Sequence, residues 1–219
     1  FKPIPQDGVK MIENKQWLYN INGNKDYLMR WPLLKAKFEQ TVFNFSIYRA
    51  GDEVYSKLKK SYSHTLLLIS CYPMCTKYTI QGMFIPQDDI QRRIDEVVSG
   101  FSERTIGVHI RRTDNVVSIQ SSPLENFTNM MDAEIKKNAN AKFYVASDDD
   151  EVKENLKSKY PDRIITLMDD TDRNSLEGMK FAVLDLFCLS KTNKIIGSVG
   201  SSYSQVAAEI GGIEVEYAK

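Results

Sequence analysis

The sequence predicts an α/β protein: a mostly parallel sheet forms its C-terminal half, and a smaller, mostly helical part precedes it. From about residue 86 onward, stretches in which apolar residues recur at helical spacing alternate with five short apolar stretches of strand length. This alternation is typical of βαβ units, whose right-handed crossovers leave the strands parallel. Three of the apolar stretches also run directly into polar residues, as strands do at a ligand-binding edge. We therefore place a domain boundary near residue 85, between regions 1–85 and 86–219.

Two elements are predicted before this boundary. Residues 27–38 have the pattern of a helix, with Pro32 either near its start or at a kink. Residues 65–72 form an apolar stretch typical of a buried strand, and Pro73 ends it because proline lacks the N–H group that a sheet requires. The rest of this region shows no clear periodicity.

Beyond the boundary, the elements can be assigned in order. Residues 86–101 predict a helix because their apolar side chains recur every three or four positions, and residues 105–110 predict a buried strand. Ser122 has the features of an N-cap, with Pro123 at the first helical position and a glutamate three residues after the cap. The later strands are predicted at 142–146, 163–167, 194–198 and 213–217, and the later helices at 152–160, 175–190 and 204–210.

The composition is that of an ordinary globular protein and confines any charge-driven function to a local site. The 219 residues include 29 Lys and Arg and 29 Asp and Glu, so the formal net charge is zero. A neutral chain does not favour binding to nucleic acid or to an anionic membrane. No apolar stretch approaches the roughly 20 residues of a membrane span, and no signal peptide is visible. We expect a cytoplasmic protein, at most peripheral to the inner face of a membrane.

The first strand of the C-terminal half ends in two arginines and an aspartate. Arg111, Arg112 and Asp114 follow Ile110 without an intervening turn residue. Guanidinium groups stay charged and present paired donors that suit phosphate oxygens. Because side chains alternate along a strand, only one of the two arginines can face a crevice at this edge. The pattern fits an anion site, such as one for a pyrophosphate, and it fits a structural Arg–Asp network equally well.

Two further strands of this half end in polar residues. The second strand runs into Asp148 and Asp149, which either face the same crevice or cap the helix that follows them. The fourth strand runs into a Gly-Ser-Ser turn that opens a helix. There, Ser201 and Ser202 could hold a phosphate together with the helix N–H groups, or one of them could serve only as an N-cap. Three polar strand ends on one sheet edge favour a binding site.

Asp185 stands alone among the apolar residues of the predicted helix at 175–190. A carboxylate that is buried there needs hydrogen-bond donors, because an unpaired buried charge is strongly unfavourable. The donors are either the two adjacent N–H groups on the edge of a guanine base or an arginine in a buried salt bridge. The sequence leaves both interpretations open.

Four motifs occur in this half: IGVHIRRTD at 106–114, YVASDD at 144–149, VLDLFCLS at 183–190 and GSSYSQVAAEI at 200–210. In order and spacing they resemble the motifs of the α1,6-fucosyltransferases and of the wider superfamily that includes the α1,2- and protein O-fucosyltransferases. The resemblance covers roughly residues 86–219. It implies a GT-B-like fold whose C-terminal, Rossmann-like half binds the nucleotide. It also implies an inverting, metal-independent transferase with GDP-fucose as donor and a glycan as acceptor.

The resemblance also implies a role for each matching residue. Arg111 resembles the arginine that grips the β-phosphate and supports the departure of GDP. His109 and Asp185 resemble the pair that reads guanosine. Arg112 and Asp114 resemble residues that shape the pocket. Asp148 and Asp149 match the paired aspartates that follow the second strand, and Ser201 and Ser202 match a serine on the phosphate side. No cofactor or metal is expected, since Arg111 supplies the positive charge at the diphosphate.

The sequence departs from the family pattern at two places. The α1,6 enzymes carry a glutamate a few residues beyond the motif aspartate, as base for the acceptor hydroxyl, whereas this chain has Ser118, Ile119 and Gln120 there. The Gly-rich motif of the family's N-terminal half is missing from residues 1–100, so this acceptor-side half is either truncated or reduced. The leading hypothesis is a fucosyltransferase of bacterial surface-glycan type. The alternative is a GDP- or nucleotide-sugar-binding module without transferase activity.

Overall fold

The computed structural model describes residues 24–37, 40–43, 66–69, 80–172 and 174–219. The chain divides into two units: the described residues from 80 onward belong to one, and the described residues up to 69 belong to the other. Within the described ranges, no helix combines the length and the apolar character that spanning a membrane would require.

The described part of the N-terminal unit contains a helix and a pair of parallel strands. Helix α1 spans Asn24–Lys37 and holds Pro32 in its interior, so the proline does not lie near the start of the helix. Strand β1 (Gln40–Phe43) pairs in parallel with β2 (Leu66–Ile69). The helix and β2 follow the sequence prediction, whereas β1 is too short to show a recognisable period. The ends of the predicted strand at 65–72 lie outside the described residues.

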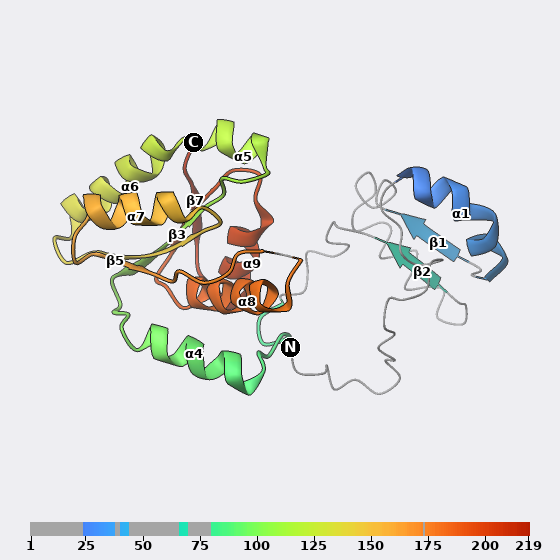
Figure 1. The fold of residues 1–219 in the computed structure, drawn as a ribbon, viewed down its shortest axis with the longest axis horizontal. Helices are drawn as coiled ribbons and strands as arrows, with labels where there is room; N and C mark the ends of the chain where they lie inside the picture. Colours follow the sequence, from blue (N-terminus) through green and yellow to red (C-terminus); the bar gives the residue numbers. More distant parts are fainter. Residues whose placement is uncertain (1–23, 38–39, 44–65, 70–79, 173) are drawn as a thin grey trace. The chain divides into compact units, whose positions relative to one another are not determined.

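The C-terminal unit is built on a five-stranded sheet in which all neighbouring strands pair in parallel (Figure 1). Its strands are β3 (Thr105–Ile110), β4 (Lys142–Ser147), β5 (Ile164–Thr166), β6 (Ile195–Gly197) and β7 (Val215–Tyr217). Their order across the sheet is β5-β4-β3-β6-β7, so the order in which strands are added across the sheet reverses between β3 and β6. Ligands of such sheets bind at the carboxyl ends of the strands beside this reversal. The predicted α/β fold class with a parallel sheet is confirmed.

Helices cover both faces of this sheet (Figure 1). Phe127 of α6 and Leu156 of α7 pack in a core on one face, and Leu184 of α8 and Ala207 of α9 pack in a second core on the other face. The strands supply alternate residues to the two cores, as the pleat requires. The helices of this unit are α4 (Asp88–Val98), α5 (Val116–Ser121), α6 (Leu124–Lys137), α7 (Asp150–Lys159), α8 (Leu176–Ser190) and α9 (Ser202–Gly211).

The segment between β3 and α6 differs from the sequence prediction. The short helix α5 fills a stretch in which no helical period is visible, because six residues make fewer than two turns. Ser122 was predicted as the N-cap of the next helix, and this is wrong: Ser122 is the C-cap of α5, and Pro123 occupies the N-cap position of α6. The Ser122 hydroxyl instead accepts a hydrogen bond from the N–H of Val199 at 2.9 Å, which joins this segment to the β6–α9 turn.

Candidate functional site

A pocket of about 640 Å³ opens among segments that follow the carboxyl ends of β3, β4 and β6. It is also bordered by α8 and by the loop that precedes it. Of the nine residues that the sequence predicts for the site, Arg112 and Asp149 do not line the pocket. The other seven do, and they are His109, Arg111, Asp114, Asp148, Asp185, Ser201 and Ser202.

The alternation of side chains beyond β3 decides which arginine reaches the pocket. His109 and Arg111 both line it, two positions apart. Arg112 turns toward α6, where its guanidinium donates to the carbonyl of Ser122 at 2.8 Å and lies 5.8 Å from the ring centroid of Phe127. The two neighbouring arginines therefore point to opposite sides, as the strand geometry predicts.

The two aspartates that follow β4 also have different surroundings. Asp149 is the N-cap of α7: its carboxylate accepts from the N–H groups of Glu151 at 3.0 Å and Val152 at 3.4 Å. The capping interpretation therefore holds for Asp149. Asp148 faces the pocket and accepts from both the N–H and the hydroxyl of Thr113, at 3.2 and 2.5 Å.

Arg111 lies between two carboxylates in the pocket. Its Nη1 is 2.5 Å from Asp148, and its Nη2 is paired with Asp114. Burial raises the pKa of Asp148, but hydrogen bonds from Thr113 and from the Arg112 N–H, with the charge of Arg111, outweigh burial and hold this pKa below its ordinary value. The Arg–Asp network that the sequence allows thus exists and borders the pocket, so it is compatible with an anion site.

His109 presents a neutral imidazole beside the pocket. Its Nδ1 is 2.7 Å from the Ser204 hydroxyl, and its ring centroid is 4.7 Å from that of Tyr203. Burial lowers the pKa of His109 to about 4; the charge of Asp148 raises this pKa, and that of Arg111 lowers it further. With Nδ1 bonded to Ser204, the second ring nitrogen can bind a ligand.

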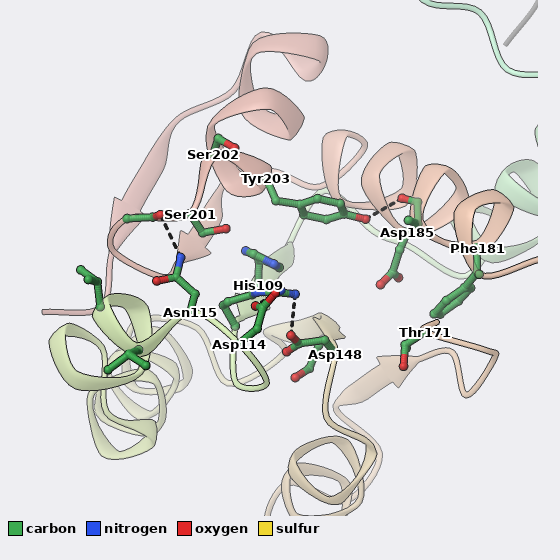
Figure 2. A pocket seen from close by; sticks show the side chains of 17 residues that line it. His109, Asp114, Asn115, Asp148, Thr171, Phe181, Asp185, Ser201, Ser202 and Tyr203 are labelled. Atoms are coloured by element: carbon green, nitrogen blue, oxygen red, sulfur yellow. Dashed lines mark hydrogen bonds and ion pairs between the residues drawn. The ribbon is translucent and has the colours of Figure 1, made fainter. Parts of the chain in front are cut away.

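Asp185 lies on another side of the pocket. Figure 2 shows Asp185 and Phe181 of α8 on one side, Asn115 and Ser201 on the other, and His109 and Asp148 between them.

The hydroxyl of Tyr144 donates to Asp185, and neither Arg111 nor Arg112 pairs with it, so the predicted alternative of an arginine salt bridge is wrong. Burial raises the pKa of Asp185 to about 7, against the hydrogen bond from Tyr144 and the charge of Lys153.

The N-terminus of α9 borders the opposite side of the pocket. Ser201 holds the N-cap position, but its side chain makes no capping hydrogen bond, and Ser202 begins the helix. Gly200 makes the turn with φ of +73°, a conformation that favours glycine, and its carbonyl accepts from the side-chain amide of Asn115 at 3.2 Å. The first N–H groups of a helix are without intrahelical partners and favour anions, so this end of the pocket suits a phosphate.

The sequence predictions did not include several lining residues: Asn115, Val116, Val117, Thr171 and Phe181. Asn115 is of a residue type preferred at N-caps, and its side chain does accept from the Ser118 N–H at 3.1 Å. The two valines, Thr171 and Phe181 carry no such signal, since apolar and loop residues are common everywhere. Among the described residues, no three His, Cys, Asp or Glu side chains are grouped so that they could hold a metal ion.

The reversal of strand order and the pocket beside it define a Rossmann-like α/β domain with a pocket at the edge of its parallel sheet. Residues 52–213 match the family described as alpha-(1,6)-fucosyltransferase N- and catalytic domains. The match covers most of the chain, and the protein belongs to this family.

Solved structures share the fold at low sequence identity. NodZ alpha-1,6-fucosyltransferase soaked with GDP-fucose is 17% identical over 74% of this chain and 60% of its own, with a TM-score of 0.50. POFUT1 in complex with GDP is 15% identical over 77% and 61% of the two chains, also with a TM-score of 0.50. Fucosyltransferase NodZ from Bradyrhizobium is 16% identical over 71% and 58%, with a TM-score of 0.50. This chain therefore spans about three fifths of the length of these proteins.

Proposed function

We propose that the pocket binds GDP-fucose and that the protein transfers the fucose to a glycan acceptor, with inversion at the anomeric carbon and without a metal ion. The observation that carries this proposal is the arrangement of one pocket: Arg111 and the N-terminus of α9 suit a diphosphate, and the buried pair His109 and Asp185 suits a base. The family supports the same donor. The fold neighbours support it too, since NodZ was soaked with GDP-fucose and POFUT1 is in complex with GDP.

Asp185 and His109 are the groups that we assign to the guanine base. An ionised carboxylate can accept hydrogen bonds from the two adjacent N–H donors on the guanine edge, which neither adenine nor uracil presents. With a pKa of about 7, Asp185 is partly protonated at neutral pH in the ligand-free protein. Guanine donors would favour the carboxylate form, because hydrogen bonds to the charged form lower the pKa of an acid.

Arg111 and the N-terminus of α9 are the groups that we assign to the diphosphate. When the bond between fucose and the β-phosphate breaks, negative charge develops on the phosphate oxygen that leaves. A fixed guanidinium and free helix N–H groups stabilise such a charge without a metal ion. Ser201 and Ser202 stand at the same helix end, where their hydroxyls can donate to a phosphate.

A nucleotide-binding module without transferase activity is the second candidate. One observation favours it: Ser118 to Gln120 contribute no carboxylate from α5. The two candidates differ in one measurable product, because only a transferase releases GDP from GDP-fucose when a panel of glycans is offered. The bacterial surface-glycan role and the cytoplasmic location stay predictions.

GDP is expected to raise the thermal midpoint of unfolding, whereas ADP and UDP at the same concentration are not. A ligand at a hundredfold excess over its dissociation constant stabilises a fold by about 2.7 kcal/mol. The measurement is thermal unfolding with each nucleotide. Equal shifts from all three would remove the guanine-reading role from His109 and Asp185 and would leave a general diphosphate site.

GDP binding is expected to survive an excess of EDTA, because Arg111 supplies positive charge to the diphosphate. The measurement is calorimetric titration of GDP into the protein with EDTA, with magnesium and with manganese. If EDTA abolished binding and manganese restored it, Asp148 would become the first candidate for a metal ligand. The same titrations of the Asp148→Asn variant would then show whether Asp148 is the metal ligand.

A further inference from the structure

A proton acceptor for the second substrate can be found among the residues that line the pocket. This inference rests on the proposed function, since a hydroxyl that attacks fucose must lose its proton during the transfer. Apart from Arg111, the titratable side chains that line the pocket are His109, Asp114, Asp148, Asp185 and Tyr203.

Three of these five groups already make hydrogen bonds to other parts of the protein. His109 is 6% exposed and bonded to Ser204, and Asp185 is 6% exposed and bonded to Tyr144. The hydroxyl of Tyr203 already donates to the carbonyl of Ala182 at 2.6 Å. These three groups line the part of the pocket that we assign to the base of the nucleotide, away from an incoming acceptor.

Asp148 is also a poor proton acceptor. Its side chain is 13% exposed and accepts from the Arg112 N–H at 2.8 Å, from the N–H and hydroxyl of Thr113, and from Arg111. These donors favour the ionised form, which is the cause of its lowered pKa, and they occupy the oxygen lone pairs that would receive a proton.

Asp114 differs from the other carboxylates in its exposure. Its side chain is 63% exposed, it lines the pocket, and it is paired with the same arginine that we assign to the leaving phosphate. The neighbouring Val116 and Val117 line the pocket too and are 61% and 62% exposed, so this side is open to a second substrate. We propose that Asp114 is the catalytic base that removes the proton from the acceptor hydroxyl.

Arg111 would couple donor binding to this step. Its Nη1 holds Asp148, whose other donors keep that carboxylate in place, and its Nη2 holds Asp114. A diphosphate that takes over Nη2 displaces Asp114 from the arginine and leaves this carboxylate beside the sugar carbon that reacts. Charge-assisted bonds to phosphate are strong enough to compete with an ion pair at an exposed site.

The bonds, electrons and protons of this transfer step can be accounted for as follows. The acceptor oxygen forms a bond to the anomeric carbon, and the bond between that carbon and the β-phosphate oxygen breaks with its electron pair left on GDP. The hydroxyl proton passes to an Asp114 carboxylate oxygen, and Arg111 stabilises the charge on the departing diphosphate.

The test measures GDP release from GDP-fucose, with water as acceptor and with sodium azide added. Asp114→Asn is expected to lower release in water by about a hundredfold or more, the scale of general-base catalysis, and to keep its affinity for GDP. Azide attacks as an anion without a proton to lose, so it is expected to restore turnover in this variant and to form fucosyl azide. Arg111→Lys should not recover with azide, because its defect lies in the leaving group.

The control is Asp95→Asn on α4, which removes an exposed carboxylate that does not line the pocket and should release GDP as the wild type does. Wild-type turnover in Asp114→Asn would overturn the base role and leave the proposed transfer standing. Loss of turnover that azide does not restore would also overturn it and leave Asp114 as a positioning residue. A wild type that releases no GDP with water, azide or the glycan panel would overturn the transfer itself, and the base role with it.

Discussion

Replacing Arg111 by lysine is expected to lower the turnover of GDP-fucose by about a hundredfold or more while the fold stays intact. Lysine keeps the positive charge but has no fork of paired donors. It therefore cannot hold Asp148 and a leaving phosphate together as Nη1 and Nη2 of the guanidinium can. The side chain borders an open pocket, so the substitution removes no core packing. The measurement is the steady-state rate of GDP release at saturating donor, with circular dichroism to verify the fold.

Arg112→Lys is the matched control for this prediction. Arg112 carries the same charge one residue later, but it donates to Ser122 and packs near Phe127, outside the pocket. We expect a smaller loss of turnover and a larger change in thermal midpoint than for Arg111→Lys. Equal turnover in the wild type and Arg111→Lys would contradict the role in leaving-group departure. Unfolding of Arg111→Lys would show instead that the Arg–Asp network is structural.

Replacing Asp185 by asparagine is expected to stabilise the ligand-free fold and to abolish the preference for guanine. The pKa of Asp185 rises from 3.8 to about 7 on folding, because burial disfavours its charge. At about 1.4 kcal/mol for each pH unit, this shift destabilises the fold by up to about 4 kcal/mol above pH 7. Asparagine carries no charge and can still accept from Tyr144. However, its amide cannot accept two donors in the way that a carboxylate does.

The pKa shift of Asp185 also determines how the free energy of unfolding changes with pH. Between about pH 4 and 7, Asp185 is ionised in the unfolded chain and protonated in the folded protein, so the free energy of unfolding falls as the pH rises. His109 acts in the opposite sense, because its pKa falls from 6.5 to about 4: between these values the free energy of unfolding falls as the pH falls. In the wild type the two contributions largely cancel between about pH 4 and 6.5.

Asp185→Asn should therefore reveal the contribution of His109. The variant is expected to lose about 1.4 kcal/mol of stability for each unit of acidification from pH 6.5 toward 4, and His109→Gln is expected to show the reverse slope. The measurement is urea unfolding across this pH range, with GDP and ADP titrations at pH 7.5 for base preference. Parallel stability curves for the wild type and both variants would show that neither group changes its pKa on folding. Retained GDP preference in Asp185→Asn would remove the guanine role.

The sequence alone determines the fold class and the edge of the sheet that carries the pocket. Alternating helix and strand periods from residue 86 predict the parallel sheet, because the period of apolar residues follows from backbone geometry. Polar residues that follow the apolar strands mark the pocket edge, since the ligand crevice of an open α/β sheet lies outside the carboxyl ends of its strands. Alternation also predicts that the side chains of Arg111 and Arg112 point to opposite sides, and the structure confirms this.

Only the tertiary structure decides which partner each polar residue has. The motif residues Asp148 and Asp149 look equivalent in sequence, yet one binds Arg111 and the other caps α7. Asp185 pairs with a tyrosine from a strand 41 positions earlier, a contact that no local pattern encodes. The exposure that distinguishes Asp114 likewise depends on how the loop before α5 lies against the β6–α9 turn. Such partners are set by packing between elements distant in sequence, whereas periodicity reports only the face on which a residue lies.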